Sequence, residues 1–287
     1  MGLGDKTVHI VIGTKAQLIK MAPVMIELDR QEIGYNFIFT GQHKETINEL
    51  MNVFGLREPD HYLYKGKDIT KITEVPKWFL SSLWKLVKHN DKYGIKKNDI
   101  ILVHGDTFST VLGALVGKLS SCKVGHVESG LRSFNIFAPF PEELNRLITF
   151  GLSDYYFCPG KWAIDNLKGY KGIKINTEVN TLFDSLQLAK KNLNKVNIDI
   201  PANKYVLVSL HRFENIYNKK SLKKNIEIIE KVAEKFKVLF ILHEPTKQNL
   251  NKFDFYERLQ RNPNIELRPR YDYFRFINLV LYKLKSN

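Results

Sequence analysis

The chain has 287 residues, of which 44% are hydrophobic, so it is long enough for two domains with sizeable cores and is not a disordered chain. No stretch of about 18 apolar residues occurs, and the N-terminus carries no signal-type segment, which excludes a membrane-spanning protein and favours the cytoplasm. The formal net charge of +14 favours polyanionic partners, but the basic residues are scattered among acidic ones and match no nucleic-acid-binding module, so nucleic acid is not an expected partner.

Apolar runs and helical periodicity alternate through the first half of the chain. The runs predict strands at 9–12, 35–40, 99–104 and 155–158, with a further strand that ends just before Glu128. Helices are predicted at 16–30, 45–54, 78–89, 110–119 and 163–167, with another that starts behind Pro141. Pro23 predicts a kink or a later start in the first of these helices. This alternation indicates an α/β fold with a parallel, doubly wound sheet.

The second half restarts the same alternation after an irregular region. Strands are predicted at 205–210, 237–242 and 264–267, and amphipathic helices at 221–236 and 273–284. Glycine, lysine and asparagine cluster between Gly169 and Pro201, where the pattern is least regular. We therefore expect a first domain over residues 1–170 and a second over residues 171–287.

Neither a metal site nor a dinucleotide cofactor is indicated. The cysteines Cys122 and Cys158 lie in apolar runs, which predicts core positions and not a disulfide or a metal pair. The turn at Gly13 follows the first strand but does not match G-x-G-x-x-G. It does lead into a helix N-terminus with Lys15 and Lys20 close by, which would stabilise an anion.

Polar residues follow the predicted strands at corresponding places in both halves. They are Lys15, Asp106, Glu128, Glu142, His211 and His243. In an α/β protein, the carboxyl ends of the strands line the crevice where ligands bind, so we expect these side chains to form a binding site. For any one of them alone, a helix cap or a bond to a carbonyl group is an adequate explanation. Six in matching places favour a functional site.

Six motifs follow one another along the chain. They are Gly13-Thr-Lys-Ala-Gln-Leu-Ile-Lys20-Met-Ala-Pro23, Thr40-Gly-Gln-His43, His104-Gly-Asp106-Thr, His126-Val-Glu128-Ser-Gly-Leu-Arg132, Pro139-Phe-Pro-Glu142-Glu-Leu-Asn-Arg146 and His211-Arg-Phe-Glu-Asn215. In this order they resemble the non-hydrolysing UDP-N-acetylglucosamine 2-epimerases. The resemblance runs from about Val8 to Phe276. It implies two Rossmann-like domains in the glycosyltransferase-B-like arrangement, with no cofactor and with a nucleotide sugar as the substrate.

The resemblance also implies a mechanism and roles for residues. UDP is eliminated to give a 2-acetamidoglucal, and UDP is then added back while a proton reaches C2 from the opposite face. The implied catalytic residues are Asp106, Glu128, Glu142 and His211, and the implied substrate-binding residues are Lys15, Lys20, Arg146, His243 and Phe276. The division of acid and base roles among the three acids cannot be read from the sequence.

This chain departs from the family pattern at three places. The family's Gly-Asn-Thr turn appears as Val179-Asn180-Thr181, with Asp184 kept. Lys15-Ala16-Gln17 stands where the family usually has Arg-Pro-Glu, which replaces a bidentate phosphate donor by a point charge. The later Ser-Gly-Gly and Glu-Glu segment of the family does not occur before Asn287, so we expect an incomplete second domain. The alternatives to a working epimerase are a catalytically impaired nucleotide-sugar-binding fragment or subunit, and the hydrolysing 2-epimerase reaction. A homodimer is compatible with the sequence, which does not define the assembly.

Overall fold

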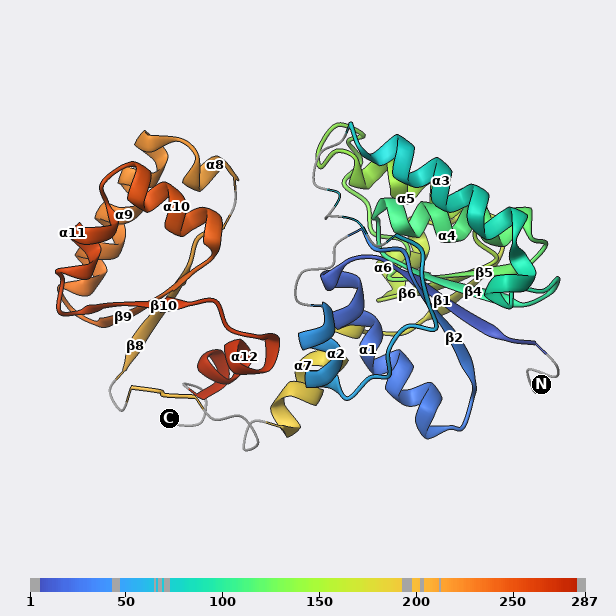
Figure 1. Cartoon of the computed structure of the whole chain (residues 1–287), viewed down its shortest axis with the longest axis horizontal. Coiled ribbons are helices and arrows are strands. Elements are labelled where there is room, and N and C mark those ends of the chain that lie inside the picture. The colour runs from blue at the N-terminus through green and yellow to red at the C-terminus, as the bar shows by residue number, and fades with distance from the viewer. Residues whose placement is uncertain are drawn as a thin grey trace. The chain divides into compact units, whose positions relative to one another are not determined.

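The computed structural model describes residues 6–42, 47–64, 66, 69, 73–192, 198–201, 204–211 and 213–282. The chain forms two compact units, Met1–Leu188 and Ala189–Asn287 (Figure 1). Each unit has its own parallel sheet and its own hydrophobic core. None of the helices in the described ranges is long and apolar enough to cross a membrane.

The first unit is built on a parallel seven-stranded sheet in the order β3-β2-β1-β4-β5-β6-β7. The strands are β1 (Val8–Ile12), β2 (Tyr35–Phe39), β3 (His61–Tyr62), β4 (Ile100–His104), β5 (Lys123–Val127), β6 (Tyr155–Cys158) and β7 (Ile173–Asn176). The direction of winding reverses between β1 and β4. A doubly wound sheet binds its ligand at this switch point, beyond the carboxyl ends of the strands.

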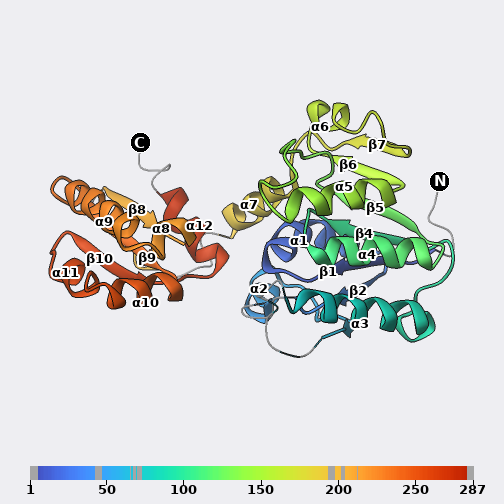
Figure 2. The same ribbon diagram turned by 90° about the horizontal axis from the view of Figure 1, so that it is seen from above.

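Helices cover both faces of this sheet (Figures 1 and 2). They are α1 (Lys15–Arg30), α2 (Ile47–Phe54), α3 (Val75–Lys88), α4 (Phe108–Leu119), α5 (Glu142–Leu152), α6 (Lys161–Asp165) and α7 (Thr181–Lys191), with a 3₁₀ helix at Asn90–Tyr93. On one face α3, α4 and α5 lie side by side, and their apolar residues, such as Trp78 and Leu112, pack against Val103 and Ile101 of β4. With helices on both faces, β1 is fully buried and β2 is nearly so, which explains why these strands are nearly continuous apolar runs.

Two expectations about elements of the first unit need correction. Helix α1 begins at Lys15 and runs through Pro23, because Thr14 and Gln17 form a capping box that satisfies the helix start. The later start that Pro23 suggested does not occur. Strand β7 lies in the region that looked irregular, and it pairs with β6, so the first unit continues to Leu188 and past the expected boundary at residue 170.

The second unit has a parallel sheet of three described strands in the order β10-β9-β8. These are β8 (Tyr205–Ser209), β9 (Lys237–Leu242) and β10 (Ile265–Pro269), with the helices α8 (Phe213–Ile216), α9 (Lys219–Ala233), α10 (Glu244–Lys252), α11 (Tyr256–Gln260) and α12 (Tyr273–Tyr282). One face of the sheet packs against α9, α10 and α11, and the other packs against α12. The strands and the long helix α9 lie where their apolar patterns predict.

Candidate active site

Three of the predicted residues of the first unit follow strands at the carboxyl edge of its sheet. Lys15 is half-buried and starts α1 after β1, Asp106 lies in the turn after β4, and Glu128 directly follows β5. Strands β4 and β5 are neighbours, with His104 opposite Val127, so the turns that carry the two acids adjoin. The sheet order therefore brings together residues that are far apart in the sequence.

Glu128 contacts Lys20 and His104. Both of its carboxylate oxygens accept hydrogen bonds from Lys20 Nζ, at 2.8 and 2.6 Å, and His104 Nε2 lies 3.0 Å from Oε2. Burial acts to raise the pKa of Glu128, but His104 and Lys20 outweigh burial and lower the pKa to about 2. Glu128 is thus held as a carboxylate. Its φ of 62° is left-handed, a strained conformation that in a residue other than glycine often marks a functional site.

Asp106 is held by the first turns of α5. Arg146 Nη2 donates to Asp106 Oδ2 at 2.5 Å, and Asn145 Nδ2 donates to the Asp106 carbonyl oxygen at 2.9 Å. The side chain of Asp106 remains 27% exposed. Helix α5 therefore fixes Asp106 in place, and the same helix begins with another predicted acid, Glu142.

Glu143, which the sequence analysis did not select, organises the arginines. Its side chain is completely buried and accepts hydrogen bonds from Arg132 Nε at 2.5 Å, Arg146 Nη1 at 3.2 Å and Ser133 N at 3.0 Å. Burial acts to raise the pKa of Glu143, but these donors outweigh it and lower the pKa to about 2. Arg146 thus contacts both Glu143 and Asp106. The buried carboxylate of Glu143 orients Arg146, and Arg146 in turn contacts the partly exposed carboxylate of Asp106.

Glu142 differs from the other acids of the site. Its Oε2 atom is buried and has no hydrogen-bond partner among the described residues. A buried oxygen without a donor costs free energy, which a hydrogen bond from a bound hydroxyl group would relieve. Glu142 is therefore the acid whose surroundings leave most freedom for a ligand contact.

Gln17 connects the turn after β1 to the end of β4. Its Oε1 accepts from Gly13 N at 2.9 Å and Thr14 N at 3.2 Å, and its Nε2 donates to His104 O at 2.8 Å. Gly13 is required here, because a methyl group on it would lie 1.9 Å from Thr40 Oγ1. The departure at Lys15-Ala16-Gln17 thus keeps a structural acceptor where the family usually has glutamate. The capping-box spacing of Thr14 and Gln17 was the sequence signal that could have revealed it.

In the second unit, His211 and His243 lie together at the carboxyl edge of the sheet. Their ring centroids are 5.3 Å apart, and His243 Nε2 lies 3.3 Å from Ser209 Oγ. Burial lowers the pKa of His243, and nearby His211 adds to this effect. Phe276, by contrast, packs on α12 against the apolar cluster of Tyr205, Leu239, Ile241 and Leu279. Its predicted contact with a nucleotide base stays a prediction.

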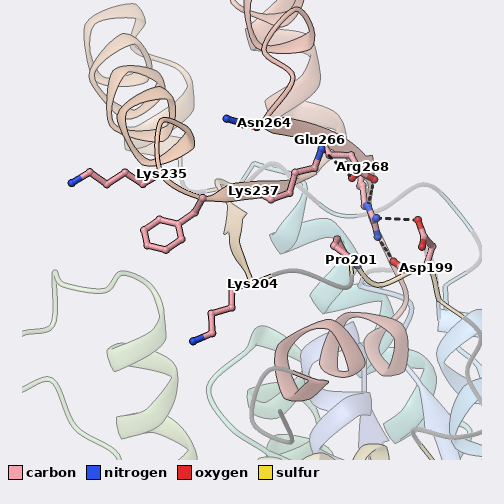
Figure 3. A pocket seen from close by; sticks show the side chains of 9 residues that line it. Asp199, Pro201, Lys204, Lys235, Lys237, Asn264, Glu266 and Arg268 are labelled. Atoms are coloured by element: carbon pink, nitrogen blue, oxygen red, sulfur yellow. Dashed lines mark hydrogen bonds and ion pairs between the residues drawn. The ribbon is translucent and has the colours of Figure 1, made fainter. Parts of the chain in front are cut away.

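The second unit also has a cavity of about 680 Å³ at a different edge (Figure 3). It lies beside the amino ends of the strands, with Lys204 before β8, Lys237 starting β9 and Asn264 before β10. Arg268 in its wall is buried and already bound by Asp199 and Glu266. This cavity is not at the edge that carries the two histidines. Among the described residues no group of three or more His, Cys, Asp or Glu could hold a metal ion.

Solved structures with this architecture define the class of protein. The structure of UDP-N-acetylglucosamine 2-epimerase from Methanocaldococcus jannaschii matches with a TM-score of 0.73 at 29% identity, over 95% of this chain and 76% of that chain. The enzyme from Neisseria meningitidis, bound to UDP-N-acetylglucosamine, matches with a TM-score of 0.76 at 27% identity, over 95% and 75% of the two chains. The fold is thus of the glycosyltransferase-B-like class, with two Rossmann-like domains, as predicted.

Sequence comparison identifies the family. A family model described as UDP-N-acetylglucosamine 2-epimerase matches residues 26–282. The M. jannaschii enzyme of that name is 32% identical over 286 residues, which cover 94% of this chain and 75% of the relative. The Bacillus subtilis enzyme is 36% identical over 214 residues, covering 73% and 54%. The chain belongs to the UDP-N-acetylglucosamine 2-epimerase family, which confirms the resemblance found in its motifs.

Proposed function

We propose that this chain catalyses the reversible C2 epimerisation of UDP-N-acetylglucosamine to UDP-N-acetylmannosamine, as an isomerase supplying surface polysaccharide or glycan synthesis. Membership of the epimerase family is the observation that carries this proposal. Suitable chemistry comes from Asp106 and Glu128 at the carboxyl edge of the first sheet, held by Arg146 and Lys20, and from Glu142 at the start of α5. His211 and His243 at the corresponding edge of the second sheet supply groups for a diphosphate.

The reaction needs acid and base groups on the sugar because no carbonyl group lies next to C2 to acidify its proton. A base removes the proton from C2 while the bond from C1 to the diphosphate oxygen breaks, and UDP leaves with the electron pair. In the second step UDP returns to C1 and an acid delivers a proton to the opposite face of C2. Cations stabilise the departing diphosphate. We assign the acids to the first unit and diphosphate binding to the second.

Incubation with UDP-N-acetylglucosamine in D₂O tests the proposal, with the C2 configuration followed by NMR. We expect UDP-N-acetylmannosamine that carries deuterium at C2. Free N-acetylmannosamine with UDP would indicate the hydrolysing reaction instead. Binding of the sugar nucleotide without turnover would indicate an impaired binding protein, and neither binding nor turnover would reject both proposals.

Variants of the acids form the second part of this test. Asp106→Asn and Glu142→Gln should each lower kcat at least 100-fold without loss of cooperative unfolding, because the transfer of a proton by a positioned group contributes about 10²- to 10⁴-fold. Glu27→Gln, which alters an exposed ion pair with Arg30 on α1, is the matched control. The expected cytoplasmic location and homodimer stay predictions, which cell fractionation and light scattering would test.

A further inference from the structure

His126 lies between the two turns that carry Asp106 and Glu128. It is a residue of β5 and is 1% exposed. Its Nε2 atom lies 2.8 Å from the carbonyl oxygen of Gly105, and its Nδ1 atom lies 3.0 Å from Ser129 Oγ. Gly105 immediately precedes Asp106, and Ser129 immediately follows Glu128. One buried ring therefore connects the backbone beside one acid to the side chain beside the other.

Only one neutral tautomer of the ring satisfies both contacts. A carbonyl oxygen can only accept, so Nε2 must carry the hydrogen, and in the neutral ring Nδ1 then accepts from the Ser129 hydroxyl group. Burial lowers the pKa of His126 to about 4, so the ring is neutral at neutral pH. The charged or titratable groups that act on it are His104 of β4, Glu128 after β5 and Arg146 of α5.

Each turn contains a residue in the left-handed conformation, which glycine adopts readily but glutamate does not, so the turn at Glu128 in particular needs support. Gly105 has a φ of 68° and Glu128 a φ of 62°. The N–H of Gly105 donates to Val127 O at 3.0 Å, so with His126 on its carbonyl group both ends of this residue are fixed to β5. Ser129 N donates to Phe157 O at 2.9 Å, which fixes the other turn to β6. A residue in a sparsely populated conformation persists only when its surroundings hold it there.

We propose that His126 is a positioning residue of the epimerase, which through its neutral Nε2–H tautomer sets the placement of Asp106 relative to Glu128. The proposal rests on the proposed function. Elimination and re-addition require two groups placed on a sugar ring at the same time, and a misplacement of about 1 Å in such a site costs about 100-fold in rate. His126 itself is buried, so it contacts the acid-bearing turns and not the substrate.

Three variants separate the two contacts. His126→Phe keeps an aromatic ring but removes both hydrogen bonds, Ser129→Ala removes only the contact to Nδ1, and His126→Gln restores a donor toward Gly105. We expect His126→Phe to lower kcat about 100-fold with less than about a threefold change in KM, because the substrate contacts stay in place while the acids shift. His126→Gln should recover at least about tenfold of that loss.

His9→Phe is the matched control. His9 is also buried in a strand of this sheet, with Nε2 2.9 Å from Asp99 Oδ2 and Nδ1 3.0 Å from Asn36 Nδ2, but it lies near the amino end of β1, away from the acids. Its loss should lower stability without changing kcat per folded molecule. If His126→Phe and His9→Phe both reduce activity only in proportion to unfolded protein, His126 is merely structural and the proposal is overturned.

A second measurement does not depend on turnover. ¹⁵N NMR of histidine-labelled protein reads the tautomer of His126 directly. We expect a protonated Nε2 and an unprotonated Nδ1 between about pH 6 and 8, and in Ser129→Ala a shift of the Nδ1 resonance. A protonated Nδ1 would overturn the proposal even in an inactive chain. An inactive wild type with the expected tautomer would instead reject the proposed function and not the placement of the two turns.

Discussion

Lys20 and Glu128 form a two-point ion pair although 108 residues separate them in the sequence. Lys20 Nζ lies 2.6 Å from one carboxylate oxygen and 2.8 Å from the other, and the Glu128 side chain is 8% exposed. The pair joins α1 to the turn after β5 across the switch point of the first sheet. Lys20, which its motif suggested as a substrate-binding residue, is thus paired with one of the acids of the site.

This pair predicts a loss of stability in acid. The pKa of Glu128 is about 2 in the folded protein against 4.5 as its ordinary value. A lowered carboxyl pKa stabilises the fold above pH 4.5, and this contribution, on the order of 3 kcal/mol, is lost as the pH falls from about 4.5 toward 2. Urea unfolding of wild type and Glu128→Gln should differ most above pH 5 and converge near pH 2. A difference that is independent of pH would contradict the pairing.

His126 predicts a second loss of stability as the pH falls, in the window between pH 6.5 and about 4. Its pKa falls from 6.5 to about 4 because the ring is buried. The unfolded chain takes up a proton near pH 6.5 and the folded protein does not, so stability falls as the pH drops from 6.5 toward 4, by about 3 kcal/mol in total. In His126→Phe the pH dependence of unfolding should be correspondingly flatter in this window. An unchanged slope would show that the imidazole is accessible to protons in the folded state.

Glu143→Gln should be strongly destabilising. The substitution leaves Arg132 and Arg146, which are only 18% and 16% exposed, without the buried carboxylate that binds both. Breaking a buried ion pair from one side costs about 3 to 5 kcal/mol. Glu27→Gln removes an exposed pair with Arg30 and should leave the unfolding midpoint unchanged within error. Equal midpoints for the two variants would show that Glu143 contributes little.

Gly113 and Gly151 should respond to alanine in opposite directions. A methyl group at Gly113 in α4 would lie 2.6 Å from Val103 Cγ1 and 3.0 Å from Val11 Cβ, so Gly113→Ala should cost about 1 to 3 kcal/mol by overpacking the helix against the sheet. At Gly151 in α5 nothing lies within 4 Å, so alanine should stabilise by about 0.5 to 1 kcal/mol through helix propensity. Thermal unfolding of both variants tests the packing. A stabilised Gly113→Ala would refute it.

His211→Gln should weaken UDP binding if the second unit holds the diphosphate as proposed. A hydrogen bond to a charged group contributes about 1.5 to 3 kcal/mol, so we expect a 10- to 100-fold higher Kd in calorimetric titration. The matched control is His89→Gln, which changes an exposed histidine at the end of α3. Equal Kd values for the two variants would remove His211 from the binding site.

The sequence by itself determined the fold class and the order of the functional residues along the chain. Buried parallel strands are continuous apolar runs, and amphipathic helices have a period of 3.6 residues. The pattern of apolar residues along the chain was therefore enough to locate β1, β4, β9 and α9. Strand β7 was missed because it is an exposed strand whose Ile173 is 59% exposed, and β3 because it has only two residues. An edge strand with solvent on its faces lacks the apolar pattern.

Only the tertiary structure decided which residues are partners. Gln17 bonds to a carbonyl group 87 residues away, Arg146 to an acid 40 residues away, and His126 to a turn 21 residues away. The local pattern of apolar residues predicts which side of a segment packs against the core, but it does not predict which strands pair in the sheet. The sheet order places the ends of β1, β4 and β5 side by side. Lys20 therefore pairs with Glu128, Glu143 orients the arginine that holds Asp106, and the buried His126 contacts the turns that carry both acids.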